Sequence, residues 1–141
     1  MDILSVKNLT KSFNGTKAVD NLSFTVPEGT IFGFVGPNGA GKTTTMKMIL
    51  GLLKPDEGKA VIDGTEVKYG ETKTNEVVGY LPDVPEFYSY LKPKEYLKLC
   101  ADITGMPSDL FIARQQELLH LVGLDNVNKK IGSFSRGMKQ R

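Results

Sequence analysis

The residues best suited to chemistry form one short glycine-rich run, Gly36-Pro37-Asn38-Gly39-Ala40-Gly41-Lys42-Thr43. It matches the pattern G-x-x-x-x-G-K-[ST] at every fixed position. Glycines lack a Cβ, so several backbone N–H groups can converge on one anion. Lys42 would supply a point charge to outer phosphates, and the Thr43 hydroxyl is a hard oxygen suited to Mg²⁺. The run predicts a phosphate-binding loop, a feature that kinases, GTPases and transport ATPases share.

The elements beside this loop are those that such a site needs. Residues 30–35 are almost continuously apolar, which predicts a strand covered on both faces. After the loop, a helix is expected from about Gly41, with its apolar stripe at Met46, Ile49, Leu50 and Leu53 and its end at Pro55 to Gly58. The positive N-terminal end of that helix would face the bound anion.

The remaining pattern divides the chain into a mixed β and α part, 1–87, and a helical part, 88–141. Residues 2–35 are expected to form strands, with Leu22, Phe24 and Val26 on one face, and 60–62 and 77–81 are expected as further short strands. Two helices should follow, with stripes at Tyr96, Leu97, Cys100 and Ala101 and at Phe111, Leu118, Leu119 and Val122. Ser108 or Asp109 is the expected N-cap of the second helix, and Gly123 its stop.

The composition gives no sign of a nucleic-acid-binding, disulfide-linked, secreted or membrane-spanning protein. The 141 residues include 18 basic and 16 acidic side chains, so the net charge of +2 gives no reason to expect nucleic acid as a partner. The single cysteine, Cys100, cannot form an internal disulfide and is expected to be a buried thiol in a reducing compartment. The N-terminus does not resemble a secretory signal, and no apolar run approaches the ~20 residues that span a bilayer.

Four ordered landmarks, the loop among them, resemble the ATPases of ABC (ATP-binding cassette) transporters. Residues 36–45 resemble the Walker A loop in their variable positions too, and Phe134 to Arg141 resembles the signature element usually written LSGGQ. Residues 79–83 resemble the segment that carries the coupling glutamine, and 9–13 the loop that stacks on adenine. The sequence around these landmarks is most similar to that of the exporter branch, whose ATPases pair with small, separate permease subunits.

This resemblance implies an α/β fold, namely a P-loop NTPase core with an incomplete parallel sheet and N-terminal antiparallel strands, plus an α-helical subdomain. It implies ATP and Mg²⁺ as cofactors. Metal contacts would come from Thr43 and Asp83. The implied nucleotide contacts are Phe13, Ala18, Gly36, Asn38, Gly39, Ala40, Gly41, Lys42, Thr43 and Thr44, with Ser135 and Gly137 reaching the nucleotide of an opposing subunit.

Some positions depart from the family pattern. Phe13 stands where tyrosine is usual, and a phenyl ring can still stack on adenine. Asp83 stands at the glutamine position, where a carboxylate could contact Mg²⁺ or its water shell or could be a solvated loop acid. Arg136 and Met138 replace the usual glycine and glutamine of the signature. His120 precedes the signature, so we interpret it as a surface residue and not as the family's switch histidine.

The catalytic part of the family pattern is not found in these 141 residues. It would be an apolar strand ending in Asp-Glu after the signature, whereas Ala60-Val61-Ile62-Asp63 precedes the signature and is followed by Gly64. We therefore expect this stretch alone to bind nucleotide weakly and not to hydrolyse it. It should also have a poorly ordered end and an open sheet edge prone to association.

For the whole protein, the resemblance implies ATP hydrolysis coupled to transport. The implied partners are permease subunits and a second nucleotide-binding domain, at the cytoplasmic face of a membrane. Two alternatives stay open. One is a soluble ABC ATPase that acts on ribosomes or DNA, and the other is a non-catalytic nucleotide-binding module.

Overall fold

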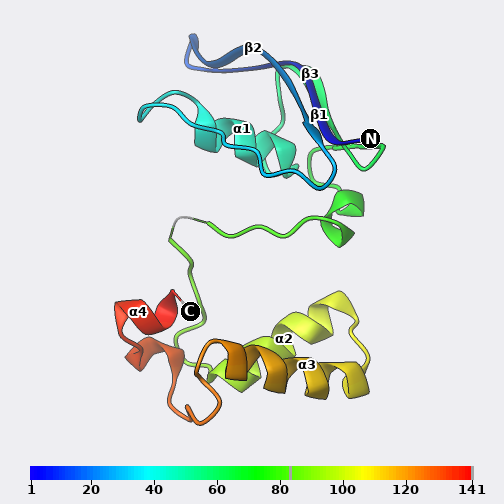
Figure 1. Ribbon diagram of the computed structural model, residues 1–141. Coiled ribbons are helices and arrows are strands. Elements are labelled where there is room, and N and C mark those ends of the chain that lie inside the picture. The colour runs from blue at the N-terminus through cyan, green and yellow to red at the C-terminus, as the bar shows by residue number, and fades with distance from the viewer. Residues whose placement is uncertain (83, 141) are drawn as a thin grey trace. The chain divides into compact units, whose positions relative to one another are not determined.

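The computed structural model describes residues 1–82 and 84–140, and these form two compact units that meet in sequence between Tyr80 and Leu81. Each unit is described by itself. The first holds β1 (Asp2–Phe13), β2 (Thr16–Pro27), α1 (Lys42–Ile49), β3 (Glu57–Ile62), β4 (Thr65–Glu66) and the 3₁₀ turn η1 (Lys73–Glu76). The second holds α2 (Pro93–Thr104), α3 (Ser108–Leu121), η2 (Ile131–Ser133) and α4 (Arg136–Lys139) (Figure 1). No helix within the described residues is long and apolar enough to cross a bilayer.

The first unit is built on an antiparallel sheet in the order β2-β1-β3-β4. A two-residue turn joins β1 to β2, and both of its residues, Asn14 (φ 49°) and Gly15 (φ 78°), have the left-handed conformation of a type I′ hairpin turn. Asn-Gly is the sequence most suited to that turn, and its twist matches that of the flanking strands. The expected N-terminal strands are therefore present as a long hairpin.

The core of this unit lies between the sheet and α1, as the ribbon shows (Figure 1). Val6 and Leu9 of β1 are each 1% exposed, and Val19, Met48, Ile49, Ala60 and Ile62 are the other members of the buried hydrophobic cluster. Along β2, half-buried Leu22, Phe24 and Val26 alternate with exposed Ser23 and Thr25, as the sequence predicts. Burial of several aliphatic side chains, at roughly 1.5–3 kcal/mol each, is the main source of stability here.

The apolar stripe of α1 differs from the prediction. The buried residues are Thr45, Met48 and Ile49, whereas Met46 is 43% exposed. A threonine can occupy the core side because its hydroxyl donates a hydrogen bond to the Gly41 carbonyl at 2.9 Å. The helix also ends earlier than expected, at Ile49 and not at Pro55, because Gly51 takes a left-handed φ of 69°.

Glycine ends all three longer helices in the same way. After α1, the Gly51 N–H bonds to the Met48 carbonyl and the Leu52 N–H to the Lys47 carbonyl. Equivalent pairs of bonds follow α2 at Gly105 and α3 at Gly123, where the predicted stop is confirmed. These are Schellman motifs, which satisfy carbonyls that the helix leaves without partners.

Two segments predicted as strands are not strands in this structure. Residues 30–35 and 77–81 have extended or irregular backbone, and Ile31 and Val35 are exposed. A parallel strand needs partners on its edges, delivered by crossover connections. Among the described residues, the sheet is entirely antiparallel and pairs with neither segment.

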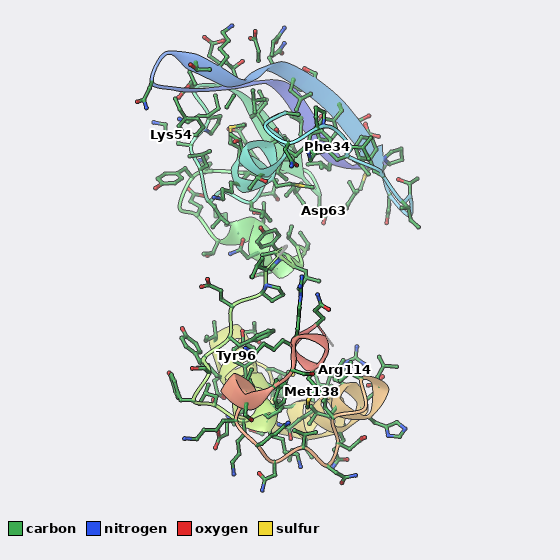
Figure 2. The ribbon with its side chains drawn as sticks, turned by 90° about the vertical axis from the view of Figure 1, so that its left-hand side faces the viewer. Phe34, Lys54, Asp63, Tyr96, Arg114 and Met138 are labelled. Carbon is green, nitrogen blue, oxygen red and sulfur yellow. The ribbon has the colours of Figure 1, made fainter. Side chains whose placement is uncertain are left out.

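Fewer side chains are buried in the second unit than in the first. Ala101, Leu119, Leu124 and Ile131 are buried. A groove of about 720 Å³ is lined by the last three of these and by Tyr96 and Met138. Figure 2 labels the side chains of Tyr96 and Met138. Cys100 is exposed, so its interpretation as a buried thiol is wrong. Ala101 is buried on α2, whereas its neighbour Cys100, turned about 100° away on the helix, lines a small cleft.

The start of α3 also differs from the prediction. The N-cap is Pro107, and Ser108 is already the first helical residue. The Pro107 carbonyl accepts the first helical bond, from the Phe111 N–H at 2.9 Å. Proline suits this boundary because its own nitrogen carries no hydrogen that would need a partner.

Candidate phosphate-binding site

The glycine-rich loop lies between the extended segment 30–35 and the first turn of α1. Gly39 and Gly41 take left-handed φ values of 83° and 84°, and the Ala40 N–H closes a turn onto the Pro37 carbonyl at 3.2 Å. Gly41 is the N-cap of α1 and has no side chain to cap the helix. The backbone N–H groups at the start of α1 are therefore open to an anion, where the helix dipole also favours negative charge.

Lys42 bends back over the loop that precedes it. Its ammonium donates to the Gly36 carbonyl at 2.5 Å and to the Pro37 carbonyl at 2.7 Å. These bonds keep the positive charge against the backbone of the first two residues of the loop. The loop thus holds a cation of its own against its backbone.

The loop is fixed to the sheet through Gly41 and Ala18. A β-carbon built on Gly41 would lie 2.2 Å from the Ala18 carbonyl oxygen and 3.0 Å from a methyl carbon of Val19. Only glycine permits this approach with φ of 84°. The structure therefore brings Ala18, expected to line the base pocket, against the C-terminal end of the phosphate loop.

The segment that leads into the loop is held by aromatic packing. The ring of Phe24 on β2 stacks on Phe32 at 5.3 Å and on Phe34 at 5.6 Å between ring centroids. Phe34 is labelled in the first unit in Figure 2. Such pairs are worth about 0.5–1.5 kcal/mol beyond the area they bury. They anchor residues 32–34 on the sheet, just before the loop begins.

Phe13, the candidate for stacking on the base, is the last residue of β1. It pairs with Thr16 across the hairpin turn and is 46% exposed, so much of its ring is available to a ligand. The Lys11 ammonium lies over the ring, 5.7 Å from its centroid. Phe13 is therefore an accessible aromatic ring held in a fixed strand, as a stacking role requires.

The other predicted residues of the loop are exposed or half-buried. Asn38 and Thr43 are exposed, and Thr44 is half-buried on α1. Mg²⁺ keeps several water ligands and is often held by one or two protein oxygens together with substrate phosphates. The exposed Thr43 hydroxyl fits that donor set. No cluster of three or more metal-ligating side chains occurs in the part of the chain that the structure describes, and Asp83 lies outside the described residues.

The signature residues belong to the second unit. Ser135 is the N-cap of α4, and its hydroxyl oxygen accepts a hydrogen bond from the Met138 N–H at 3.2 Å. Gly137 is exposed, and a β-carbon there would meet nothing within 4 Å. The segment just before them is tied to residues 89–91, because the Gly132 N–H bonds to the Ser89 carbonyl and the Ile131 N–H to the Leu91 carbonyl.

His120 is a surface residue, as predicted. Its side chain is 85% exposed, and its Nδ1 lies 3.1 Å from an Asp125 carboxylate oxygen at the end of α3.

Sequence reasoning missed one acidic residue, Asp56. Its carboxylate accepts hydrogen bonds from the Lys11 ammonium at 2.8 Å and from the Ser12 N–H at 2.7 Å. These two bonds, with that from Lys11 the larger effect, hold the pKa of the Asp56 carboxyl below its usual value. In the sequence, Asp56 is part of Pro55-Asp56-Glu57-Gly58, which predicts only a turn. No signal in it pointed to a partner 45 residues earlier.

Comparison with known proteins matches this arrangement to one family. Residues 19–141 match the family model described as ABC transporter. The chain is 41% identical over 140 residues to the bacitracin transport ATP-binding protein BcrA of Bacillus licheniformis. It is 38% identical over 141 residues to the ABC transporter ATP-binding protein YhcH of Bacillus subtilis. Each match covers 99% of this chain and 45% of the relative, so the chain spans about half the length of the curated relatives it matches.

Solved structures agree with the sequence matches. An ATP-binding subunit of an ABC transporter superposes with a TM-score of 0.88 at 32% identity, over 98% of this chain and 58% of its own. An ATP-binding cassette in its ADP conformation gives a TM-score of 0.73 at 26% identity, over 98% of this chain and 61% of its own. The predicted P-loop NTPase fold, with its N-terminal antiparallel strands and its helices, is thereby confirmed.

Proposed function

Because this chain belongs to the ABC transporter family, we propose that its glycine-rich loop binds Mg²⁺·ATP and that the whole protein couples ATP hydrolysis to transport. The single observation that carries the proposal is the position of Lys42. Its ammonium is held by the Gly36 and Pro37 carbonyls, and Lys42 is the first residue of α1. A cation and a set of free N–H groups meet there, and together they favour a highly charged anion such as a triphosphate.

Binding exchanges one set of hydrogen bonds for another. In the free protein the two carbonyls satisfy the Lys42 ammonium, and a phosphate oxygen would take their place with a charge-assisted bond. The bound Mg²⁺ would neutralise charge that develops on the phosphates, and the Thr43 hydroxyl would be its protein ligand. Phe13 would stack on the adenine ring, and Ala18, beside Gly41, would line the base pocket.

The signature residues would act on a nucleotide held by a second molecule. Ser135 uses its hydroxyl oxygen to accept from the Met138 N–H, which leaves its own O–H free to donate to a phosphate oxygen. Gly137 is exposed and has no side chain that would cover its N–H. A head-to-tail pair of chains would enclose two nucleotides, and the second unit would pass closure of that pair to permease partners at the inner face of a membrane.

The test compares Lys42→Ala with Lys47→Ala, which removes an exposed lysine from the same helix. Mg²⁺·ATP affinity is measured by isothermal titration, and folding by circular dichroism. Hydrogen bonds to charged groups contribute about 1.5–3 kcal/mol, so Lys42→Ala should weaken binding by about 10- to 100-fold. Lys47→Ala should bind as the unmodified protein does. Equal affinity in both variants would contradict the proposal.

A further inference from the structure

The far end of β1 is held by a side chain from another part of the first unit. The Asp56 carboxylate accepts from the Lys11 ammonium with one oxygen at 2.8 Å and from the Ser12 N–H with the other at 2.7 Å. The Asp56 N–H in turn donates to the Thr10 carbonyl at 2.9 Å. Three consecutive residues before Phe13 are therefore bound to a single aspartate.

The sheet alone does not supply these contacts. Pairing between β1 and β3 ends at Thr10 and Glu57, so Ser12 lies beyond the last β3 partner. The pairing of β1 with β2 is irregular between Lys11 and Ser12. A backbone N–H at such a position needs another acceptor, and the Asp56 carboxylate takes the place of the strand carbonyl that would otherwise fill that role.

Lys11 extends the arrangement to the ring itself. Its side chain is only 15% exposed although it is charged, and its ammonium is paired with Asp56. The same ammonium lies over the Phe13 ring, 5.7 Å from the centroid. Because the cation covers one side of the ring, a base that stacks on Phe13 would have to use the other side.

We infer that Asp56 is a positioning residue for the nucleotide base, because it fixes both the Ser12 backbone and the Lys11 cation beside Phe13 and so orients the Phe13 ring for stacking. The inference rests on the proposed function. It adds a residue that would set affinity for the base and leave affinity for the phosphates unchanged. Asp56 touches neither Phe13 nor the phosphate loop through any hydrogen bond, so its influence would pass through Ser12 and Lys11.

The test needs a ligand with a base and one without. Affinities for Mg²⁺·ATP and for Mg²⁺·tripolyphosphate are measured by isothermal titration in the unmodified protein and in Asp56→Ala, Phe13→Ala and the double variant. Stacking contacts of this kind account for up to about a tenfold change in affinity. Asp56→Ala should weaken ATP binding by about 3- to 10-fold and change tripolyphosphate binding less than about twofold. The double variant should bind ATP no more weakly than Phe13→Ala alone.

Two further variants separate positioning from folding. Glu66→Gln removes another ion pair of the same sheet, Lys59–Glu66 at 3.6 Å, and should leave both affinities unchanged. Asp56→Asn keeps an acceptor for the Ser12 N–H while it removes the charge opposite Lys11, so it should fold and should lose part of the ATP affinity. Thermal unfolding of each variant shows which ones are folded at the temperature of the titration.

The outcomes distinguish this inference from the proposed function. Equal losses for ATP and tripolyphosphate in Asp56→Ala would make Asp56 a general support of the fold and overturn the inference. An unchanged ATP affinity in Asp56→Ala, with a clear loss in Phe13→Ala, would also overturn it but leave the proposed function intact. Failure of the unmodified protein to bind either ligand would overturn the proposed function itself.

Discussion

The carbonyl oxygen of Ala18 occupies the space where a side chain at Gly41 would begin. A β-carbon on Gly41 would be 2.2 Å from that oxygen, well inside van der Waals contact. Ala18 lies on β2, and Gly41 is the N-cap of α1. This close approach limits how far the glycine-rich loop can lie from the hairpin that carries Phe13.

Gly41→Ala should therefore be more damaging than Gly39→Ala. Both glycines have a φ near 83°, so both substitutions carry the strain of a left-handed non-glycine residue, about 1 kcal/mol. Only Gly41 adds a steric overlap, since a β-carbon on Gly39 meets nothing within 4 Å. We expect Gly41→Ala to lower the free energy of unfolding by at least about 2 kcal/mol in chemical denaturation. Equal losses in the two variants would show that the approach to Ala18 carries no cost.

Thr43→Val should affect Mg²⁺-dependent binding but not stability, whereas Thr45→Val should affect stability. Thr43 is exposed, and we propose that its hydroxyl binds Mg²⁺, so Thr43→Val should raise the Mg²⁺ concentration needed for ATP binding and leave the melting temperature unchanged. Thr45 is 1% exposed and bonds the Gly41 carbonyl. Thr45→Val should lower the free energy of unfolding by about 1 kcal/mol. Titrations of ATP at several Mg²⁺ concentrations, with thermal unfolding, measure both. A stability loss in Thr43→Val would argue against its assigned role.

Acid should remove the stabilisation that Asp56 provides. The bonds from Lys11 and Ser12 lower the pKa of the folded carboxyl below its ordinary value of 3.8. The contribution is then fully present above the unfolded pKa and is lost as the pH falls through the folded pKa. We expect Asp56→Asn to melt below the unmodified protein from pH 7 to about pH 5, with the difference shrinking below about pH 4. A difference that stays constant down to pH 3 would contradict this assignment.

Gly132→Ala should loosen the segment that leads into the signature. A β-carbon on Gly132 would lie 2.9 Å from the Ser89 carbonyl oxygen, which also accepts the Gly132 N–H. We expect a loss of about 1–3 kcal/mol in stability and faster amide exchange at Ile131 and Gly132, measured by hydrogen–deuterium exchange. Gly137→Ala is the control for stability, because its β-carbon meets nothing within 4 Å and alanine favours a helix. Protection at Ile131 that survives Gly132→Ala would refute the prediction.

Local signals in the sequence were sufficient for several features. The spacing of Gly36, Gly41 and Lys42 predicted a loop before a helix, and the alternation along 22–26 predicted the half-buried strand β2. Gly123 predicted the end of α3. Each of these depends on the conformational preferences of a few consecutive residues, which a sequence states directly.

Other features depended on contacts between distant residues. Residues 30–35 are apolar enough for a buried strand, but strand formation also needs a partner edge, and the described sheet offers none to this segment. The elements packed around α1 and α2 decided two further features. They determined which side of α1 is buried, and they left Cys100 of α2 exposed.

The contacts of Asp56 and Gly41 show the same limit at the candidate site. Asp56 bonds residues 44 and 45 positions earlier, and Gly41 meets a carbonyl 23 positions earlier. The sequence alone predicted a glycine-rich loop suited to phosphate, because that loop is made of adjacent residues. The tertiary structure decided what holds the loop and Phe13 in place, because those contacts form only when the hairpin, α1 and the start of β3 come together.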